Sequence, residues 1–296
     1  MAYWFMKAAD LGHTDAQVDY AMLCIEGMGV PVNYAMAMKY LHMAASGANP
    51  SSQAMTNIAS LHSQGFGVPQ DYLTAREWWL KAAERGSRQS MYALGIMYQN
   101  GRFGQPDQEE ALKWLTMAGD NGHELAAVSL GYRYFLGRHG HSPDMERAAH
   151  WLVKAVNYNV ENGADSPFFL GTLLFHGEVV NLDKPAAARL YALAAQRGNV
   201  YAAIELAKAM EKGDGINQNV QMAISIYKDL ANRGLPDAYY YLGRLYLNGQ
   251  YVSKDLVKSL TLLHIAAINC VSLSLAWSVA RLIIAVLVCR ASSSSL

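Results

Sequence analysis

The strongest constraint on this sequence is an internal repeat of 36 to 39 residues. Each repeat can be anchored on the residue that opens a Lys-Ala-Ala-like triplet. A period in this range is typical of stacked two-element units that bury their apolar faces against their neighbours, so we expect a solenoid. The anchors are Lys7, Met43, Lys81, Met117, Lys154, Leu193, Asp229 and Ile265.

The residues around each anchor predict a helix, which we call helix B. A large residue lies three positions before the anchor, and a small residue lies six before it or one after it. Because large and small residues three or four apart share one stripe of a helix, we expect the large column to be core. That column consists of Trp4, Tyr40, Trp78, Trp114, Trp151, Leu190, Ile226 and Leu262.

An Asn or Asp lies ten positions before the anchor in every complete repeat. The side-chain oxygens of these residue types accept hydrogen bonds from the amides of a helix's first turn. This column therefore predicts where each helix B begins. Its members are Asn33, Asp71, Asp107, Asp144, Asp183, Asn219 and Asp255.

A second set of columns predicts a preceding helix, helix A. A small residue follows a mostly bulky one, at Ala21, Ala59, Gly95, Gly131, Gly171, Ala207 and Gly243. Six residues further on, an unbroken glycine column predicts the end of helix A, since glycine readily adopts the left-handed conformation of a C-cap. The glycines are Gly27, Gly65, Gly101, Gly137, Gly177, Gly213 and Gly249.

Several stretches resemble the Sel-one-like repeat, a relative of the tetratricopeptide repeat. They are Leu94–Gly104, Glu110–Gly122 and Arg76–Gly86. The resemblance implies an all-α, α/α superhelical solenoid whose usual role is to hold other proteins as a non-catalytic scaffold or adaptor. It covers roughly residues 1–267, as a partial repeat over 1–14 and seven repeats over 15–50, 51–87, 88–123, 124–164, 165–199, 200–235 and 236–267.

The two ends of the sequence leave alternatives open. Residues 1–14 contain helix B alone, which indicates a truncated cap or, as we favour, a fragment of a longer array. After residue 267 the register stops, and residues 268–296 are mostly apolar. A capping helix is the favoured interpretation of this segment. A membrane anchor around Cys270–Cys289 and a non-native tail at Ser292–Ser295 are the alternatives, and Arg281 disfavours membrane insertion.

Composition and motifs give little support for catalysis, metal binding or nucleic-acid binding. The formal net charge is zero and the three cysteines are scattered, so we expect neither nucleic-acid binding nor a cysteine-based metal site. Some members of the resembling family are linked to penicillin binding, and Ser225–Lys228 reads S-x-x-K. No base or companion motif accompanies it, so a penicillin-recognising enzyme remains only an alternative. His139, His141 and His150 lack acidic or cysteine partners at ligand spacing. We expect no cofactor and no metal.

The functional expectation concerns the exposed side of helix A. In related tetratricopeptide arrays helix A lines the concave surface, which implies that positions three before, one after and four after the small residue face a partner. The partner is expected to be a protein or a peptide, and aromatic residues in the middle repeats favour this surface. The wider set includes Val128, Thr172, Ile204, Glu211 and Leu247. The candidate residues are Tyr92, Ile96, Gln99, Tyr132, Phe135, Phe168, Phe175, Lys208, Tyr240 and Arg244.

Overall fold

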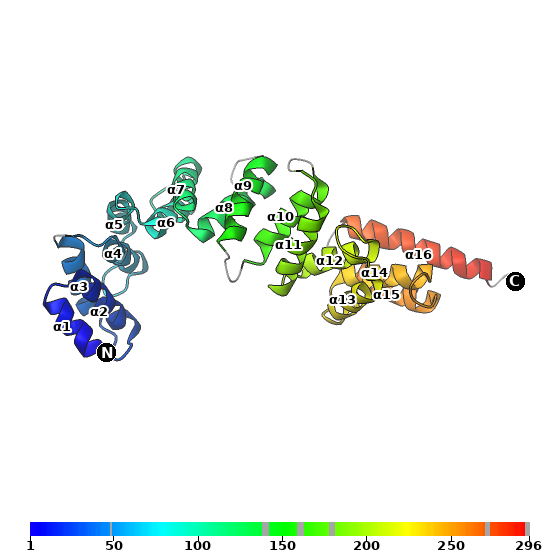
Figure 1. The fold of residues 1–296 in the computed structure, drawn as a ribbon, viewed down its shortest axis with the longest axis horizontal. Coiled ribbons are helices and arrows are strands. Elements are labelled where there is room, and N and C mark those ends of the chain that lie inside the picture. The colour runs from blue at the N-terminus through cyan, green and yellow to red at the C-terminus, as the bar shows by residue number, and fades with distance from the viewer. Residues whose placement is uncertain (48, 138–141, 159–162, 178–180, 270–272, 294–296) are drawn as a thin grey trace. The chain divides into compact units, whose positions relative to one another are not determined.

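The computed structural model describes residues 1–47, 49–137, 142–158, 163–177, 181–269 and 273–293. Every regular element within these ranges is an α-helix, and none of them is a strand (Figure 1). The all-α solenoid expected from the repeat is confirmed.

Helices of type A and type B alternate along the chain. The type A helices are α2 (Thr14–Glu26), α4 (Ser52–Gln64), α6 (Arg88–Gln99), α8 (Glu124–Leu136), α10 (Asp165–His176), α12 (Val200–Lys212) and α14 (Pro236–Asn248). The type B helices are α1 (Ala2–Asp10), α3 (Tyr34–Ser46), α5 (Tyr72–Glu84), α7 (Gln108–Asp120), α9 (Met145–Asn157), α11 (Lys184–Gln196), α13 (Val220–Asn232) and α15 (Leu256–Ile268). A longer helix, α16 (Leu273–Ser293), follows.

The helix boundaries lie where the Asx and glycine columns predict them. Asp71, for example, precedes α5 and accepts hydrogen bonds from Leu73 N at 2.9 Å and Thr74 N at 3.1 Å. All seven members of the Asx column cap a helix B in this way. All seven glycines of the other column have positive φ, as Gly65 does at 74°. Local capping chemistry therefore favours the start of each helix B from α3 to α15 and the end of each helix A.

The chain forms two compact units, Met1–Val160 and Glu161–Leu296. Within each unit, every helix packs against the next one along the chain. The first unit has a core built around α2, α3 and α4, with Leu41 and Ile58 fully buried. The second unit has cores around Tyr191, around Tyr227 and around Leu263.

A close contact between the two helices of a repeat joins the small residue of helix A to a large residue of helix B. A Cβ atom added at Gly95 would lie 2.7 Å from Leu115 Cγ, and one at Gly131 would lie 2.8 Å from Leu152 Cδ2. Gly243 meets Leu263 in the same way. The small residues therefore allow the two helices to approach closely, and the leucine side chains fill the space beside them.

The burial of the side chains confirms the expected core column of helix B at two positions and corrects it at the others. The residue after the predicted aromatic column is buried in every helix B from α3 to α15, as Leu115 is. The aromatic column itself is buried at Tyr40 and Trp151 but only half-buried at its other positions in these helices, as at Trp114. The Trp114 indole Nε1 donates to Glu110 Oε2 at 3.1 Å. Helix A packs on the residue that follows the aromatic column, as Gly95 does on Leu115 and Gly131 on Leu152. Trp151 packs on Gly119 of α7, the preceding helix B. A Cβ atom added at Gly119 would lie 2.5 Å from the Trp151 ring.

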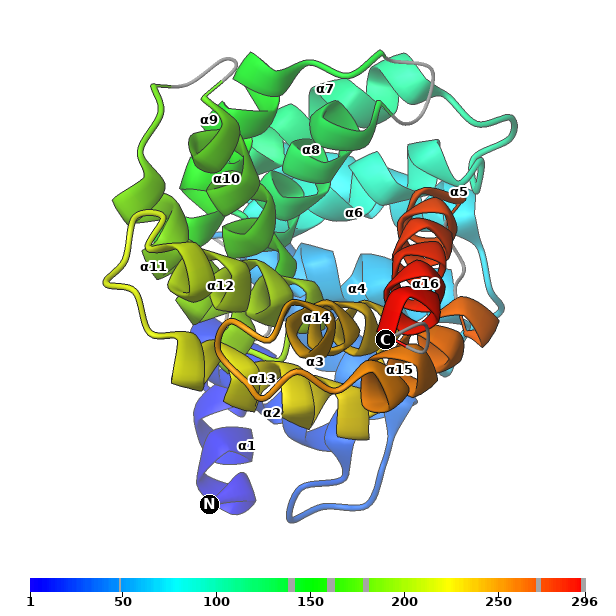
Figure 2. The same ribbon diagram turned by 90° about the vertical axis from the view of Figure 1, so that its right-hand side faces the viewer.

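Helix α16 lies along α14 and α15 in the second unit (Figures 1 and 2). Val279 and Val286 are fully buried there, in one cluster with Leu247, Leu263 and Ala266. Within the described ranges, no helix has the combination of length and apolar character that crossing a membrane requires. The side chains of Cys270, Cys289 and Ser292–Ser295 lie outside the described residues.

Candidate protein-interaction surface on helices A

The ten candidate residues all lie on helices A, from α6 to α14, and all of them are half-buried. Two members of the wider set are different. Ile204 is 4% exposed and Leu247 is 8% exposed, so both belong to the core. Ile204 packs in the cluster of Tyr227, and Leu247 is part of the cluster beneath α16, which removes both from the candidate surface.

In the first unit, Tyr92 of α6 is held in place by His123. The two rings stack with centroids 4.3 Å apart and an interplanar angle of 16°. His123 is the N-cap of α8, and its Nδ1 accepts a hydrogen bond from Ala126 N at 3.3 Å. Its Nε2 therefore carries the proton and donates to Gln89 Oε1 at 2.9 Å. Burial lowers the pKa of His123, and the nearby Arg88 lowers it further, which favours this neutral form.

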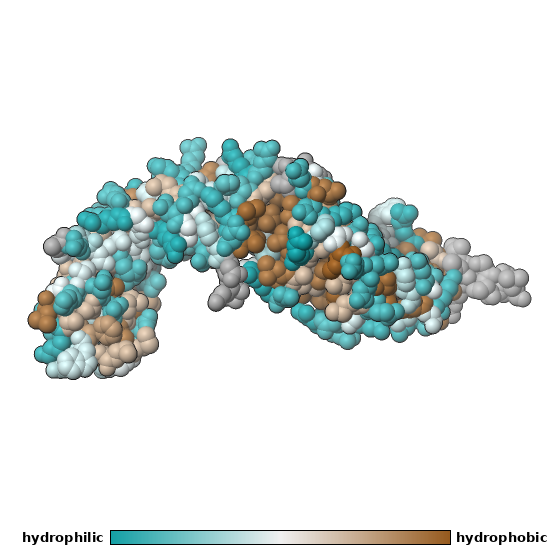
Figure 3. Space-filling view, viewed as in Figure 1, coloured by the Kyte–Doolittle hydropathy of each residue, from teal (hydrophilic) through white to brown (hydrophobic). Residues whose placement is uncertain are grey.

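The surface in the second unit begins with the aromatic residues of α10. The rings of Phe168 and Phe175 lie 6.1 Å and 6.3 Å from the ring of Tyr191 on α11. The ammonium of Lys184 lies over Phe175, 5.3 Å from its centroid. Both phenylalanines thus contribute to the core cluster of Tyr191 while keeping part of their area exposed. Figure 3 shows apolar side chains at the surface around α10.

Further along the second unit, the surface becomes charged. Arg244 Nη2 donates to both carboxylate oxygens of Glu211, at 2.5 Å and 2.6 Å. The Tyr227 hydroxyl donates to Glu211 Oε2 at 3.2 Å. The guanidinium of Arg244 also lies 5.2 Å from the centroid of Tyr241, which stacks on Tyr227. Tyr227 and Tyr241 therefore both contact the ion pair that joins α12 and α14.

A second ion pair lies one helical turn earlier on α12. Lys208 Nζ donates to both oxygens of Glu205, at 2.7 Å and 2.8 Å, and lies 5.9 Å from the ring centroid of Tyr241. Burial raises the pKa of Asp237 at the start of α14, an effect that the charge of Lys208 opposes. The result is a surface that changes from aromatic on α10 to ionic on α12 and α14.

Sequence reasoning missed Glu205, Asp237 and Tyr241 as parts of this surface. Glu205 and Lys208 are three residues apart on one helix, a spacing that predicts their contact. The role of Tyr241 has no such local signal, because its ring is positioned by Tyr227 on the neighbouring α13.

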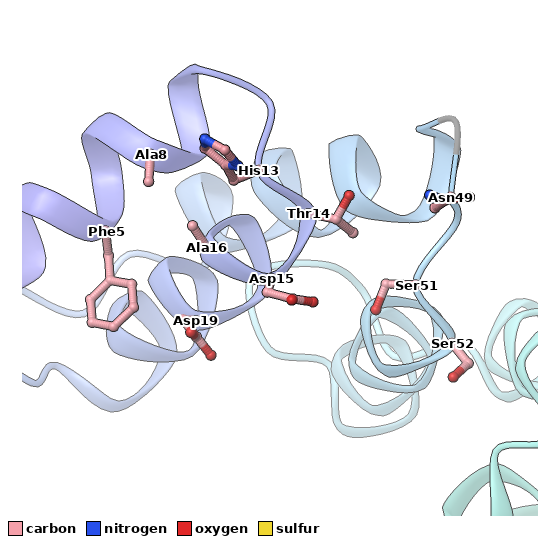
Figure 4. Close-up of a pocket in the computed structure, with 10 residues that line it drawn as sticks. All are labelled: Phe5, Ala8, His13, Thr14, Asp15, Ala16, Asp19, Asn49, Ser51 and Ser52. Carbon is pink, nitrogen blue, oxygen red and sulfur yellow. The ribbon is translucent and has the colours of Figure 1, made fainter.

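The first unit contains two adjoining hollows near its N-terminus. One, of about 780 Å³, is lined in part by His13, Asp15 and Asp19 of α2 and its N-cap, and by Ser51 and Ser52 at the start of α4 (Figure 4). The other, of about 610 Å³, is apolar and is lined by Met1, Trp4, Phe5, Ala8 and Ala16. Phe5, Ala8 and Ala16 line both hollows, so the two form one groove along α1 and α2.

The described residues give no further support for catalysis or metal binding. Ser225 and Lys228 are both exposed on α13. The described residues contain no group of three or more His, Cys, Asp or Glu side chains that could hold a metal ion. His150 is exposed and touches Trp151 edge-on at 5.2 Å, whereas His139 and His141 lie outside the described residues.

Paired helices with Asx N-caps, glycine C-caps and close contact at a small residue define an α/α solenoid repeat protein. The family model of the Sel1 repeat matches residues 2–13, 14–49, 52–87, 88–123, 125–157, 164–199, 200–235 and 236–269. The chain therefore belongs to the Sel1 repeat family. Sel1 repeats generally mediate protein–protein interaction.

The chain is similar to a known mammalian protein. DAP3-binding cell death enhancer 1 of Rattus norvegicus is 36% identical over 197 residues, which are 62% of this chain and 38% of that protein. The chain thus corresponds to well under half of that relative's length.

Two solved structures share the fold. A protective antigen of uropathogenic Escherichia coli with an SLR fold has a TM-score of 0.72 and 26% identity, covering 91% of this chain and 56% of the antigen. A Sel1 repeat protein from Oxalobacter formigenes has a TM-score of 0.56 and 26% identity, covering 95% of this chain and 79% of its own.

Proposed function

We propose that this chain is a non-catalytic scaffold or adaptor that binds a protein segment on the exposed side of its helices A. The observation that carries the proposal is the half-buried state of all ten candidate residues. Side chains that are positioned by neighbours yet keep area exposed lose little conformational freedom on binding, which favours affinity.

Aromatic residues and arginine, the residue types that dominate binding energy at interfaces, are well represented on this surface. Phe168 and Phe175 offer apolar contact area on α10, and Arg244 offers a guanidinium already oriented by Glu211. A partner with apolar side chains followed by polar ones, in an extended segment or a helix, fits this order best. A relative whose name describes binding to the protein DAP3 supports a protein as partner.

The test begins with crosslinking and pull-down on the intact gene product to isolate a partner. Tyr132, Phe135, Phe168 and Phe175 are then replaced singly by Ala, and binding is measured by calorimetry. We expect one or two of these changes to weaken binding by about 1–2 kcal/mol.

Two exposed residues on α13, Lys228 and Asp229, provide the matched controls. Their replacement by Ala should leave both binding and thermal stability unchanged. Normal binding by all four aromatic variants, together with lost binding in a control, would place the interface on helices B and overturn the proposal. Unfolding of the aromatic variants would assign these rings to the core.

A further inference from the structure

Arg76 of α5 holds a position that is apolar in every other helix B with an Asx cap. The position lies five residues after the N-cap, and its members are buried or half-buried. An arginine at this position takes part of a charged side chain out of water, which costs free energy unless the charge is paired. The other members of the column are Met38, Leu112, Ala149, Ala188, Ile224 and Leu260.

Two aromatic rings hold the guanidinium of Arg76 without neutralising its charge. Its Cζ atom lies 5.5 Å from the ring centroid of Tyr98, in the last turn of α6, and 5.6 Å from that of Phe103 in the following loop. The two rings meet edge-on, with centroids 5.0 Å apart. Because a guanidinium stacked on aromatic faces keeps its in-plane N–H donors available, this arrangement orients Arg76 for a planar acceptor.

The Arg76 side chain lacks an acceptor of its own. Its Nε atom is buried and has no hydrogen-bond partner. Within the part of the chain that the structure describes, no carboxylate forms an ion pair with it. The carboxylates of Asp71 and Asp107 instead cap α5 and α7. Since a buried donor on a charged group is costly to leave unpaired, these contacts indicate an acceptor from another molecule.

Arg102 adds a second guanidinium at the same joint between repeats. It is exposed, and its Cζ atom lies 5.5 Å from the ring centroid of Tyr72, which is one turn before Arg76 on α5. At the corresponding positions of another joint, Lys184 and Asp214 form an ion pair at 2.8 Å. An aromatic ring thus replaces one of the two charges here, and Arg102 has no carboxylate partner among the described residues.

We propose that Arg76 and Arg102, together with the rings of Tyr72, Tyr98 and Phe103, form a docking site for an acidic segment of a protein partner. The site rests on the scaffold function proposed above and adds a carboxylate-binding anchor to it. A carboxylate accepts two parallel hydrogen bonds from one guanidinium, which gives both affinity and a fixed orientation. The aromatic rings exclude water from one side of each pair and strengthen it.

The surroundings of the site favour a carboxylate over a phosphate group. Phosphate sites commonly use free amides at a helix N-terminus, whereas Asp71 already binds first-turn amides of α5. The charge of Asp71 also disfavours a ligand group with roughly two negative charges at pH 7. A singly charged, planar carboxylate of the partner fits these conditions best.

Fluorescence anisotropy on the full chain tests the site with a labelled peptide in which glutamate and glycine alternate. Arg76→Met, which restores the residue type of Met38, should weaken binding of this peptide at least about 10-fold. A matched peptide with glutamine in place of glutamate should bind the wild type equally weakly. Binding of the glutamate peptide should also weaken as the ionic strength rises, because salt screens exposed charges.

Arg147→Gln is the matched control. Arg147 also lies over a ring, that of Tyr134 at 5.5 Å, but it already pairs with Asp144 at 3.3 Å. This variant should bind the glutamate peptide as the wild type does.

Thermal stability separates a binding role of Arg76 from a structural one. Arg76→Met removes an unpaired buried donor from an apolar column, so its Tm should equal or exceed that of the wild type. A lower Tm with unchanged peptide binding would assign Arg76 to packing and overturn the proposal. Arg102→Gln changes only an exposed side chain, so it tests the site even if Arg76→Met does not fold, and it should weaken peptide binding.

Two further variants distinguish this docking site from the surface on helices A. Phe168→Ala and Phe175→Ala lie in the second unit and should leave binding of the glutamate peptide unchanged. Equal binding of the glutamate and glutamine peptides by the wild type would overturn the docking site and leave the scaffold function intact. Tighter binding of a matched phosphoserine peptide would overturn the assignment to carboxylates.

Discussion

Arg244 and Glu211 form an ion pair between two successive helices A, with one guanidinium nitrogen 2.5 Å and 2.6 Å from the two carboxylate oxygens. The Glu211 side chain is 13% exposed and that of Arg244 is 25% exposed. This pair joins two successive repeats, and it also orients the guanidinium on the candidate surface.

Removal of one partner should therefore destabilise the second unit. Arg244→Leu leaves the carboxylate of Glu211 largely buried with only the Tyr227 hydroxyl as a donor, so we expect a loss of about 1–3 kcal/mol in the free energy of unfolding. Urea denaturation measures it. Glu211→Gln and the double variant complete a double-mutant cycle. A coupling energy near zero would show that the pair contributes nothing to the joint between α12 and α14.

Substitution of either Gly95 or Leu115 should lower the free energy of unfolding. Leu115→Ala leaves a cavity in a fully buried site and should cost about 2–5 kcal/mol. Gly95→Ala places a methyl group 2.7 Å from Leu115 Cγ and should cost about 1–3 kcal/mol. Hydrogen exchange should locate the damage in α6, α7 and their neighbours, because a solenoid has only nearest-neighbour contacts.

Trp114→Ala is the comparison for this pair. Since Trp114 is half-buried and beside the helix A contact, its loss should destabilise the chain less than Leu115→Ala does. A larger loss for Trp114→Ala would show that Trp114 contributes more to the stability of the core than Leu115 does.

His123 should make the stability of the first unit depend on pH. Burial lowers its pKa in the folded state below the unfolded value of about 6.5. In the interval between these two pKa values the unfolded state binds more protons, so stability falls as the pH drops below about 6.5. Protonation also removes the Nδ1 acceptor that caps α8.

The measurement compares the wild type with His123→Asn, which keeps a capping side chain but does not titrate. Urea denaturation at pH 7.5 and pH 5.0 should show a larger loss for the wild type than for the variant. Equal losses would assign the pH dependence to other groups, such as His42, whose pKa burial also lowers.

Much of this architecture could be predicted from local chemistry. Asp71 and the other Asx residues bind amides two or three positions away, and Gly65 needs only its own φ to end a helix, so both boundaries are readable from sequence. The candidate surface could be predicted less well. Glu205 and Lys208 share a helix and a readable spacing, whereas Glu211 and Arg244 meet only because α12 and α14 pack in one register.

The sequence by itself determined the number and type of helices, their caps and the positions where helices A and B meet, because these depend on spacing along one chain. Tertiary structure decided how far each of two adjacent columns is buried. Trp114 and Leu115 are about 100° apart around α7, and only the rotation of that helix against Gly95 places the leucine inside. It also decided the position of α16, since the burial of Val279 and Val286 depends on contacts with α14 and α15 that no local pattern encodes.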